Sequence, residues 1–310
     1  MSQKKDILSI RDLTKEDILF ILETAASLKE ILDRPIKKVP PLRGKTMVHL
    51  FFEPSTRTKL SFELAAKRLS ADTVGISKSS SSVTKGEDLI DTAKNIEAMR
   101  PDVLVLRHPC SGAAHLMAKA VNCSVINAGD GTNEHPTQAL LDMFTVKEHF
   151  GTLEGLKIAI IGDILHSRVA HSDMIGFTKM GSEVVICGPG TLIPPAPEIY
   201  GVKVEYNLLD AIKDADVVMA LRLQKERQGK HLIPSDREYA SLFGINAEIL
   251  QKTKSEAIIM HPGPINRGIE MSPDVADSDR SLILNQVTNG VAVRMALLSI
   301  LMAETGGQRQ

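Results

Sequence analysis

The segment FFEPSTRTKLSFE, residues 51 to 63, decides how this chain folds. It starts as an apolar run typical of a β-strand, and Pro54 disfavours helical backbone at Glu53, so the strand is predicted to end there. Ser55 suits the N-cap of a helix, and apolar residues from Leu60 onward recur at helical spacing. The segment therefore predicts a strand, a tight turn and a helix, which is the unit that builds parallel α/β sheets.

The helix start predicted after Pro54 has the chemistry of an anion site. Backbone N–H groups at a helix N-terminus would converge there with three hydroxyls and one guanidinium, from Ser55, Thr56, Thr58 and Arg57. A phosphate group fits such a set of donors. Taken alone, an S-T-R-T tetrapeptide more often belongs to an ordinary capped helix with a solvated arginine, so the rest of the chain has to decide between the two readings.

Composition predicts a globular chain with two domains and limits the classes of partner. The chain has 310 residues, of which 43% are hydrophobic and 24% charged, and a formal net charge of −1. This balance argues against a surface for nucleic acid or for an anionic membrane. The three cysteines include no C-x-x-C pair, which argues against a disulfide framework or zinc knuckle and favours a cytoplasmic location. We expect neither a signal peptide nor an apolar run of the ~18 to 20 residues that a membrane span needs.

Strand-like and helix-like runs alternate along the chain in two series. The expected strands of the first series are residues 47–52, 103–107 and 124–128, and those of the second are 157–163, 183–188, 216–221 and 257–263. We therefore predict an α/β protein of two domains, each a mostly parallel sheet flanked by helices, joined by interdomain helices. The predicted domains are 1–150 and 151–288. A helix at about 135–151 is expected to connect them, and a helix at about 289–304 to pack back on the first.

Polar residues follow almost every predicted strand, where open α/β sheets collect their ligands. In the first half these groups are PSTRT, Arg107-His108-Pro109 and the AGDGTNEHPTQ loop, which holds His135 and Gln138. In the second half they are GDILHSR, RLQKER and HPGPINRG. Each has an ordinary explanation when taken singly, such as a helix cap for His135, a solvated Gln138 or a structural ion pair for Arg107. The serine-rich residues 77–88 have the composition of a flexible surface loop.

Several catalytic motifs are absent from the sequence. It has no G-x-x-x-x-G-K-[ST] loop, no G-x-G-x-x-G after a strand, no G-x-S-x-G and no H-E-x-x-H. The IIGDILHS segment starts like a dinucleotide turn but lacks the later glycines, so we expect no cofactor and no metal. A cleft rich in donors suits transfer of a group from an activated phosphate to a good nucleophile. There, orientation can contribute roughly 7 to 11 kcal/mol, against roughly 3 to 5 kcal/mol from general acid–base help.

Taken together, these residues resemble the aspartate/ornithine carbamoyltransferase family. The motifs F-x-E-P-S-T-R-T-x-x-S-F-E, R-H-P, H-P-T-Q, R-x-Q-K-E-R and H-P-x-P occur in the family's order over essentially the whole chain. RLQKER and HPGPINRG resemble the aspartate-specific members, whereas ornithine-specific members carry D-x-x-x-S-M-G and H-C-L-P. The resemblance implies transfer of the carbamoyl group of carbamoyl phosphate to the α-amino group of L-aspartate, an early step of pyrimidine synthesis. It also implies direct attack through a tetrahedral intermediate, with no covalent enzyme intermediate.

The resemblance assigns a role to each matched residue. The carbamoyl phosphate set is Ser55, Thr56, Arg57, Thr58, Arg107, His135, Gln138, Gly263 and Pro264, of which Arg57, Thr58, Arg107 and His135 are the catalytic group. The aspartate set is Lys85, Arg168, Arg222 and Gln224. Arg107 and His135 would polarise the carbonyl, while Gln138 and the backbone carbonyls of Gly263 and Pro264 would hold the carbamoyl amide. His135 is preferred as a hydrogen-bond donor or electrostatic stabiliser, because departing phosphate can accept the amine proton.

The resemblance also implies an assembly. In the family a serine-rich loop reaches the active site of a neighbouring subunit in a homotrimer, and Ser81 and Lys85 match its functional positions. The loop is one residue shorter than in some members, and glycine replaces leucine in the H-P-x-P motif. A larger assembly with regulatory chains or dihydroorotase stays open.

Two alternatives remain at this point. The first is a carbamoyltransferase for another amine such as ornithine, which would need an acidic or thiol-bearing site where this chain offers Arg222 and Lys225. The second is a non-catalytic scaffold that binds phosphometabolites, and it predicts the loss of donors at matched positions. Every matched position keeps its chemistry, which favours the enzyme.

Overall fold

The computed structural model describes residues 4–77, 87–225, 227 and 232–304. It divides into two compact units: unit 1 comprises Met1–Leu141 and Val287–Gln310, and unit 2 comprises Asp142–Gln286. The chain thus passes between units inside two helices, α5 (Pro136–Phe150) and α11 (Ile283–Glu304). The sequence analysis instead put the boundaries at or near the ends of these helices, after residues 150 and 288. The two units are described separately below.

Unit 1 is built on a parallel sheet, which within the described residues has four strands in the order β2-β1-β3-β4. Its strands are β1 (Thr46–Phe51), β2 (Asp72–Ser77), β3 (Val103–His108) and β4 (Ser124–Asp130). In register, Leu50 of β1 lies between Ile76 of β2 and Leu106 of β3. The all-parallel pairing confirms the predicted sheet type. Strand β2 was not predicted, because its DTVGIS sequence mixes polar residues with a glycine and gives little strand signal.

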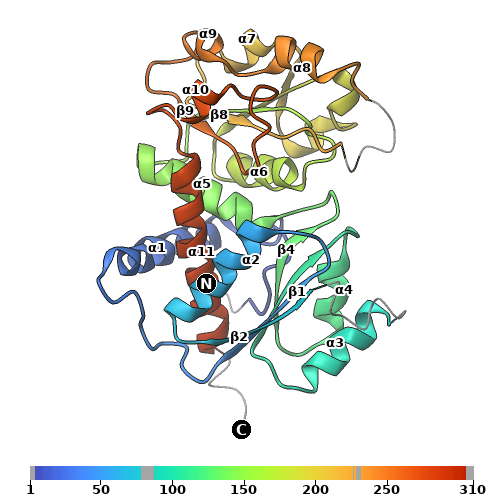
Figure 1. Cartoon of the computed structure of the whole chain (residues 1–310), viewed down its shortest axis with the longest axis vertical. Helices are drawn as coiled ribbons and strands as arrows, with labels where there is room; N and C mark the ends of the chain where they lie inside the picture. Colours follow the sequence, from blue (N-terminus) through green and yellow to red (C-terminus); the bar gives the residue numbers. More distant parts are fainter. Residues whose placement is uncertain (1–3, 78–86, 226, 228–231, 305–310) are drawn as a thin grey trace. The chain divides into compact units, whose positions relative to one another are not determined.

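Helices cover both faces of the unit 1 sheet. They include α1 (Lys15–Lys29), α2 (Thr56–Arg68), α3 (Leu89–Glu97) and α4 (Ala113–Ala120), and Figure 1 shows α3 and α4 together on the face opposite α2. Alternate residues of β1, among them Val48 and Leu50, pack with Met117 of α4 in one buried cluster. Helix α1 begins with a capping box between Thr14 and Asp17.

Unit 2 is built on a second parallel sheet, which in the described part of the chain has five strands in the order β7-β6-β5-β8-β9. Its strands are β5 (Lys157–Ile161), β6 (Glu183–Cys187), β7 (Lys203–Glu205), β8 (Val217–Ala220) and β9 (Ile258–Met260). Its α-helices include α6 (Arg168–Lys179), α7 (Leu208–Ile212), α8 (Asp236–Phe243), α9 (Ala247–Leu250) and α10 (Pro273–Ala276). The short edge strand β7 was not predicted.

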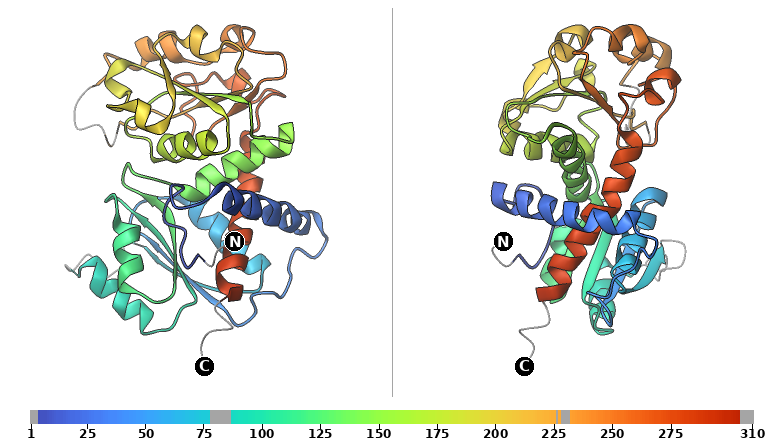
Figure 2. Two further views of the ribbon diagram at one scale, coloured as in Figure 1. Left: turned by 180° about the vertical axis from the view of Figure 1, so that it is seen from behind. Right: turned by 90° about the vertical axis from the view of Figure 1, so that its left-hand side faces the viewer.

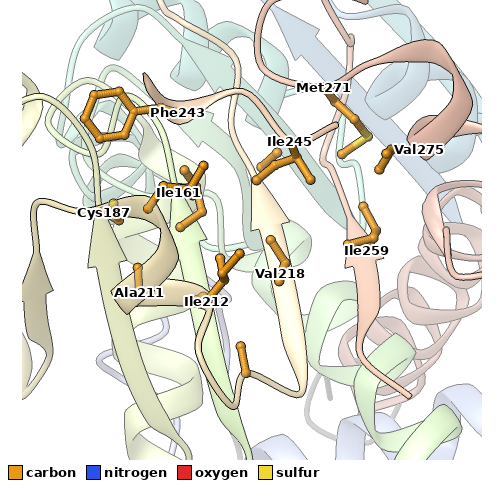
Figure 3. Close-up of a cluster of buried hydrophobic side chains, with 14 of the residues drawn as sticks. Ile161, Cys187, Ala211, Ile212, Val218, Phe243, Ile245, Ile259, Met271 and Val275 are labelled. Atoms are coloured by element: carbon orange, nitrogen blue, oxygen red, sulfur yellow. The ribbon is translucent and has the colours of Figure 1, made fainter. Parts of the chain in front are cut away.

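One face of the unit 2 sheet carries a large apolar core. Figure 3 shows side chains of three neighbouring strands in this core: Ile161 and Val218 lie near Ile212 of α7, and Ile259 points toward Val275 of α10. From behind, Figure 2 shows the same sheet between α6 and the helices of this core. Each fully buried aliphatic side chain of this kind contributes roughly 1.5 to 3 kcal/mol, which fixes the strand ends that carry the polar residues.

Helix α11 is longer and more apolar than the sequence analysis expected. It begins at Ile283 instead of about residue 289, although the NQVTNG run in its first turns favours helix weakly. Tertiary hydrogen bonds support this start: Gln286 accepts from the His261 backbone N–H (2.9 Å) and donates to Asp142 (2.7 Å). Residues 283–303, with a mean hydropathy of 1.4, are also long and apolar enough for a membrane span, contrary to expectation. The span is 72% buried, however, and the core helix of a soluble protein passes the same test.

Both sheets contain a topological switch point. The chain leaves β1 toward β2 on one side and returns to β3 on the other, and it leaves β5 toward β6 and returns to β8. In open α/β sheets ligands bind outside the carboxyl ends of the strands at such a point. The expected crevices are therefore at the ends of β1 and β3 in unit 1 and of β5 and β8 in unit 2.

Candidate active site

The PSTRT segment forms the junction between β1 and α2, as predicted. Ser55 is the N-cap residue in extended conformation, but its hydroxyl makes no capping hydrogen bond with the helix. The predicted capping role of this side chain is therefore wrong, and an anion can take the place that a cap would fill. Thr56 and Arg57 are exposed, whereas Thr58 is buried.

Arg107, at the end of β3, connects this junction to the neighbouring strands. Its Nη1 donates to Thr58 Oγ1 (3.5 Å) and to the Ala128 carbonyl (3.4 Å), and its Nε lies 3.6 Å from Glu53 Oε2. The hydrogen bonds are long, so they orient the guanidinium without enclosing it. The structure therefore brings Arg107 and Thr58 together at the switch point of unit 1, with Glu53 as a counter-charge that the sequence analysis missed.

A buried aspartate shapes the loop between β4 and α5. The Asp130 carboxylate accepts from the Gly112 backbone N–H (2.6 Å), from Asn127 Nδ2 (2.8 Å) and from the Glu134 backbone N–H (3.2 Å). Asn133 Nδ2 also donates to it (3.1 Å), and these donors together hold the loop in a single conformation. The loop leads directly to His135.

His135 immediately precedes α5 and Gln138 lies in its first turn, and both are at most 9% exposed. The Gln138 backbone N–H donates to the His135 carbonyl (2.9 Å), which fixes their spacing. The preceding Glu134 carboxylate is held by the N-terminal segment, because it accepts from the Ser9 hydroxyl and from the Ile10 backbone N–H (2.8 Å). Residues more than 120 positions apart in sequence thus anchor the start of this helix.

His108 of the R-H-P motif shapes the loop after β3. Its Nδ1 accepts from the Cys110 backbone N–H (3.0 Å), and its ring packs edge-on to Phe52. Burial lowers the pKa of His108, which favours the neutral ring that this acceptor role requires.

In unit 2, Arg168 is the first residue of α6 and is only 2% exposed. The preceding Ser167 caps the helix by accepting from the Ala170 backbone N–H (3.2 Å). The buried Asp163 carboxylate, just after β5, organises the same loop by accepting from His166 Nδ1 (2.8 Å) and from the His166 backbone N–H (3.1 Å).

Arg222 and Gln224 follow β8 and contact each other. Arg222 Nη2 donates to Gln224 Oε1 (3.2 Å), and the Gln224 backbone N–H donates to Asp163 (3.1 Å). Arg227 Nη1 donates to the His166 carbonyl (3.1 Å) and ties the two loops together. Asp163 thus links the ends of β5 and β8, so Arg222 and Gln224 lie at the switch point of unit 2.

The HPGP loop after β9 is held by its own histidine. His261 Nδ1 accepts from the Gly263 backbone N–H (2.8 Å), and His261 Nε2 lies 3.3 Å from Glu270 Oε1. Gly263 has φ of +65°, in the left-handed region, and the Gly263–Pro264 peptide bond is cis. Glycine adopts this positive φ without steric cost.

Two predicted interface residues, Ser81 and Lys85, lie outside the described residues. In the part that is described, no group of three or more His, Cys, Asp or Glu side chains is arranged to hold a metal ion.

The carboxylates that support these sites were not among the predicted site residues. Asp130 and Asp163 each follow a glycine at or just after the end of a strand, in the sequences AGDG and IGDI. From sequence alone, an aspartate in this position is typical of a solvated turn. Only its burial and its hydrogen-bond donors in the structure show that it holds the loop in place. The sequence signal that could have identified these aspartates is the Gly-Asp pair that occurs beside both clusters of candidate residues.

Two family profiles match nearly the whole chain. The profile described as aspartate/ornithine carbamoyltransferase, carbamoyl-P binding domain, matches residues 5–148. The profile described as aspartate/ornithine carbamoyltransferase, Asp/Orn binding domain, matches residues 154–301.

Individual relatives agree with these profiles. A protein of Desulfotalea psychrophila named aspartate carbamoyltransferase catalytic subunit is 62% identical, with 98% of this chain and 95% of the relative covered. Aspartate transcarbamoylase from Trypanosoma cruzi in complex with carbamoyl phosphate and aspartate superposes with a TM-score of 0.89 at 31% identity, covering 97% of this chain and 98% of the other. Ornithine carbamoyltransferase from Pyrococcus furiosus gives a TM-score of 0.85 at 30% identity, with 98% of both chains covered. The chain therefore belongs to the aspartate/ornithine carbamoyltransferase family.

Proposed function

We propose that this protein transfers the carbamoyl group of carbamoyl phosphate to the α-amino group of L-aspartate, releasing N-carbamoyl-L-aspartate and phosphate for pyrimidine synthesis. The observation that carries the proposal is the pair of donor clusters at the two switch points, Thr58 with Arg107 in unit 1 and Arg222 with Gln224 in unit 2. The Trypanosoma cruzi relative was solved with both proposed substrates, which supports the same substrate pair here.

In unit 1 the β1–α2 junction would bind the phosphate. Backbone N–H groups of the first turn of α2, the hydroxyls of Ser55, Thr56 and Thr58, and the Arg57 guanidinium complement three phosphate oxygens. Arg107 and His135 would donate to the carbonyl oxygen, where negative charge develops as the tetrahedral intermediate forms. Gln138, together with the backbone carbonyls of Gly263 and Pro264, is assigned to the carbamoyl amide.

In unit 2 the arginines would bind aspartate. Planar guanidinium groups form paired hydrogen bonds with carboxylates, and Arg168 and Arg222 offer one for each carboxylate of the substrate. Gln224 holds Arg222 and would add an amide donor. The hydrogen bonds of Asp163 keep the loop that carries Gln224 in place.

The reaction would proceed by direct attack of the neutral amine on the carbamoyl carbon. The C–N bond forms, the C–O bond to phosphate breaks, and the departing phosphate takes the amine proton. The enzyme supplies orientation and charge stabilisation, and no enzyme nucleophile is needed.

The proposed assembly is a cytoplasmic homotrimer in which Ser81 and Lys85 act in a neighbouring subunit's site. The name "catalytic subunit" carried by the relatives supports a multi-subunit assembly. A mass measurement in solution tests the trimer. Mixing Lys85→Ala with Arg57→Ala protein should restore part of the activity through hybrid trimers, whereas no recovery would argue against a shared site.

A two-acceptor assay tests the proposed reaction. The purified protein receives carbamoyl phosphate with either aspartate or ornithine, and ureido product and phosphate are measured. We expect stoichiometric ureido product and phosphate with aspartate alone. Product with ornithine but not aspartate would establish the alternative acceptor, and no product with either would favour the scaffold.

A further inference from the structure

Thr137, two residues after His135, is fully buried and contacts two functional groups through its side chain. Its Oγ1 lies 3.4 Å from His135 Nδ1 and accepts a hydrogen bond from Arg294 Nη2 at 3.4 Å. Arg294 belongs to α11 and is itself only 3% exposed. A buried arginine on the last helix therefore reaches the candidate catalytic histidine through one hydroxyl.

The surroundings of Arg294 are shaped to hold it. Its Nη1 donates to the Gly290 carbonyl (3.0 Å), and its guanidinium lies over the Phe62 ring of α2, 5.1 Å from the centroid. A Cβ at Gly290 would lie 2.6 Å from Nη1, so a larger residue there would require the guanidinium to move. Arg294 thus joins α11 to α2, which begins within the proposed phosphate segment, and to α5, which His135 immediately precedes.

The hydrogen-bonding capacities of these groups decide where the imidazole proton lies. A guanidinium has donors only, so Thr137 Oγ1 is the acceptor toward Arg294. The hydroxyl has one proton to donate, and among its contacts within the described residues only His135 Nδ1 is able to accept it. Leaving a buried hydroxyl proton without an acceptor is unfavourable, so the network selects the form in which Nδ1 accepts.

We propose that Thr137 and Arg294 are positioning residues that hold His135 as the neutral Nε2–H tautomer. This inference rests on the proposed function, because it concerns how His135 donates to the carbamoyl carbonyl. A neutral imidazole donates from one nitrogen only, and accepting from Thr137 at Nδ1 reserves Nε2–H for the substrate. The arginine acts on the reaction through Thr137, and it need not touch a substrate.

The test combines tautomer measurement with kinetics. Protein labelled with 15N-histidine is examined by long-range 1H–15N correlation NMR, with the His135 signal assigned from a His135→Gln variant. We expect wild-type His135 to be protonated at Nε2 and unprotonated at Nδ1. Thr137→Val removes the hydroxyl at nearly constant shape and should yield a mixture of tautomers, with kcat lowered about tenfold to 100-fold. The KM for carbamoyl phosphate should change far less.

Two further variants separate the hydroxyl from general packing. Thr137→Ser keeps the hydroxyl and should retain the wild-type spectrum and most of kcat. Arg294→Met should weaken the tautomer preference less than Thr137→Val does, since Thr137 remains. The matched control is Thr253→Val in unit 2, where the Thr253 hydroxyl likewise accepts from an arginine, Arg280 Nη2 (2.5 Å), and it should alter neither tautomer nor kcat.

A wild-type His135 protonated at Nδ1 would overturn the proposal, as would a Thr137→Val protein with unchanged spectrum and kcat. If Arg294→Met kept the full tautomer preference, the role of Arg294 would be refuted. The NMR spectra require no turnover, so they test the tautomer of His135 even if the two-acceptor assay rejects the proposed function.

Discussion

The two units position their candidate ligand-binding side chains in different ways. In unit 1 the candidate donors lie on strand–helix junctions, so local sequence positions most of them: PSTRT joins β1 to α2, and His135 immediately precedes α5. In unit 2 Arg222 and Gln224 lie on an irregular segment after β8, which a carboxylate from the end of another strand holds. Phosphate suits converging backbone N–H groups, which any helix start offers. A dicarboxylic acid needs two guanidinium groups at a set spacing, which only tertiary contacts provide.

Despite this difference, the two units share one structural feature, a buried aspartate that holds a loop. Asp130 in unit 1 and Asp163 in unit 2 are both fully buried at the end of a strand, and each accepts backbone N–H groups of the loop beside it. Both loops lie next to a switch point. Rigid support of the candidate donors is therefore common to the units, while the donors themselves differ.

The largest expected effect tests the local design of unit 1. Arg57→Ala should lower kcat/KM by about 10³-fold, because one charge-assisted donor to the transferring group is lost. The fold should remain, since Arg57 is exposed and the α2 core residues are untouched. Steady-state kinetics and circular dichroism measure the two outcomes. Lys67→Ala, which removes an exposed cation from the same helix, is the control, and near-normal kinetics for Arg57→Ala would move the phosphate site elsewhere.

A smaller effect tests unit 2 and its substrate. Arg222→Ala should raise the KM for aspartate roughly 100-fold while changing the KM for carbamoyl phosphate little, because a charged carboxylate loses one partner. Initial rates with each substrate varied in turn provide the measurement. Arg237→Ala, an exposed arginine of α8, should behave as wild type. An equal rise in the KM for both substrates would contradict the assignment of aspartate to unit 2 and of carbamoyl phosphate to unit 1.

The smallest effect concerns stability in unit 2. Asp173 of α6 is fully buried, and within the described residues neither carboxylate oxygen has a hydrogen-bond partner. Burial, followed by the negative charge of Asp142, raises the pKa of Asp173 well above 3.8. Folding therefore takes up a proton at this site: the stabilising contribution is complete below about pH 3.8 and is lost as pH rises through the raised pKa.

Replacing Asp173 should remove this contribution to the pH dependence of stability. Asp173→Asn should raise Tm by about 2 to 4 °C at pH 8 and by less at pH 5, since the amide needs no proton uptake. Thermal unfolding at both pH values gives the comparison, and Asp33→Asn, at an exposed position in unit 1, is the control. A Tm gain that is larger at pH 5 would reverse the assigned direction of the pKa shift.

The sequence was informative wherever periodicity and turn chemistry agreed. The apolar runs that became β1, β3, β4, β5 and β6 were bounded within a few residues, because buried parallel strands are continuous apolar segments. Strands β2 and β7 were not predicted, because they are strands through pairing with a neighbouring strand more than through their composition. The early start of α11 was missed for a related reason, because hydrogen bonds of Gln286 offset weak helix propensity.

For the candidate site, the sequence identified the donors but not the residues that support them. Arg57, Arg107 and Arg222 were identifiable because they belong to polar motifs at or after the ends of apolar runs. Thr137 and Arg294 were not, since Thr137 looks like an ordinary helix residue and Arg294 lies in an apolar helix far along the chain.

The amino-acid sequence by itself determined the α/β class, the two series of strands and the chemical type of each donor, because these depend on local hydrophobic pattern and side-chain identity. The tertiary structure decided which donors share a switch point, which carboxylates hold the loops and which nitrogen of His135 faces a hydroxyl. Those features depend on contacts such as Gln224 with Asp163 and Arg294 with Thr137, which join residues 61 and 157 positions apart. Neighbouring residues carry no signal for such pairs, and only the packed chain brings them within hydrogen-bonding distance.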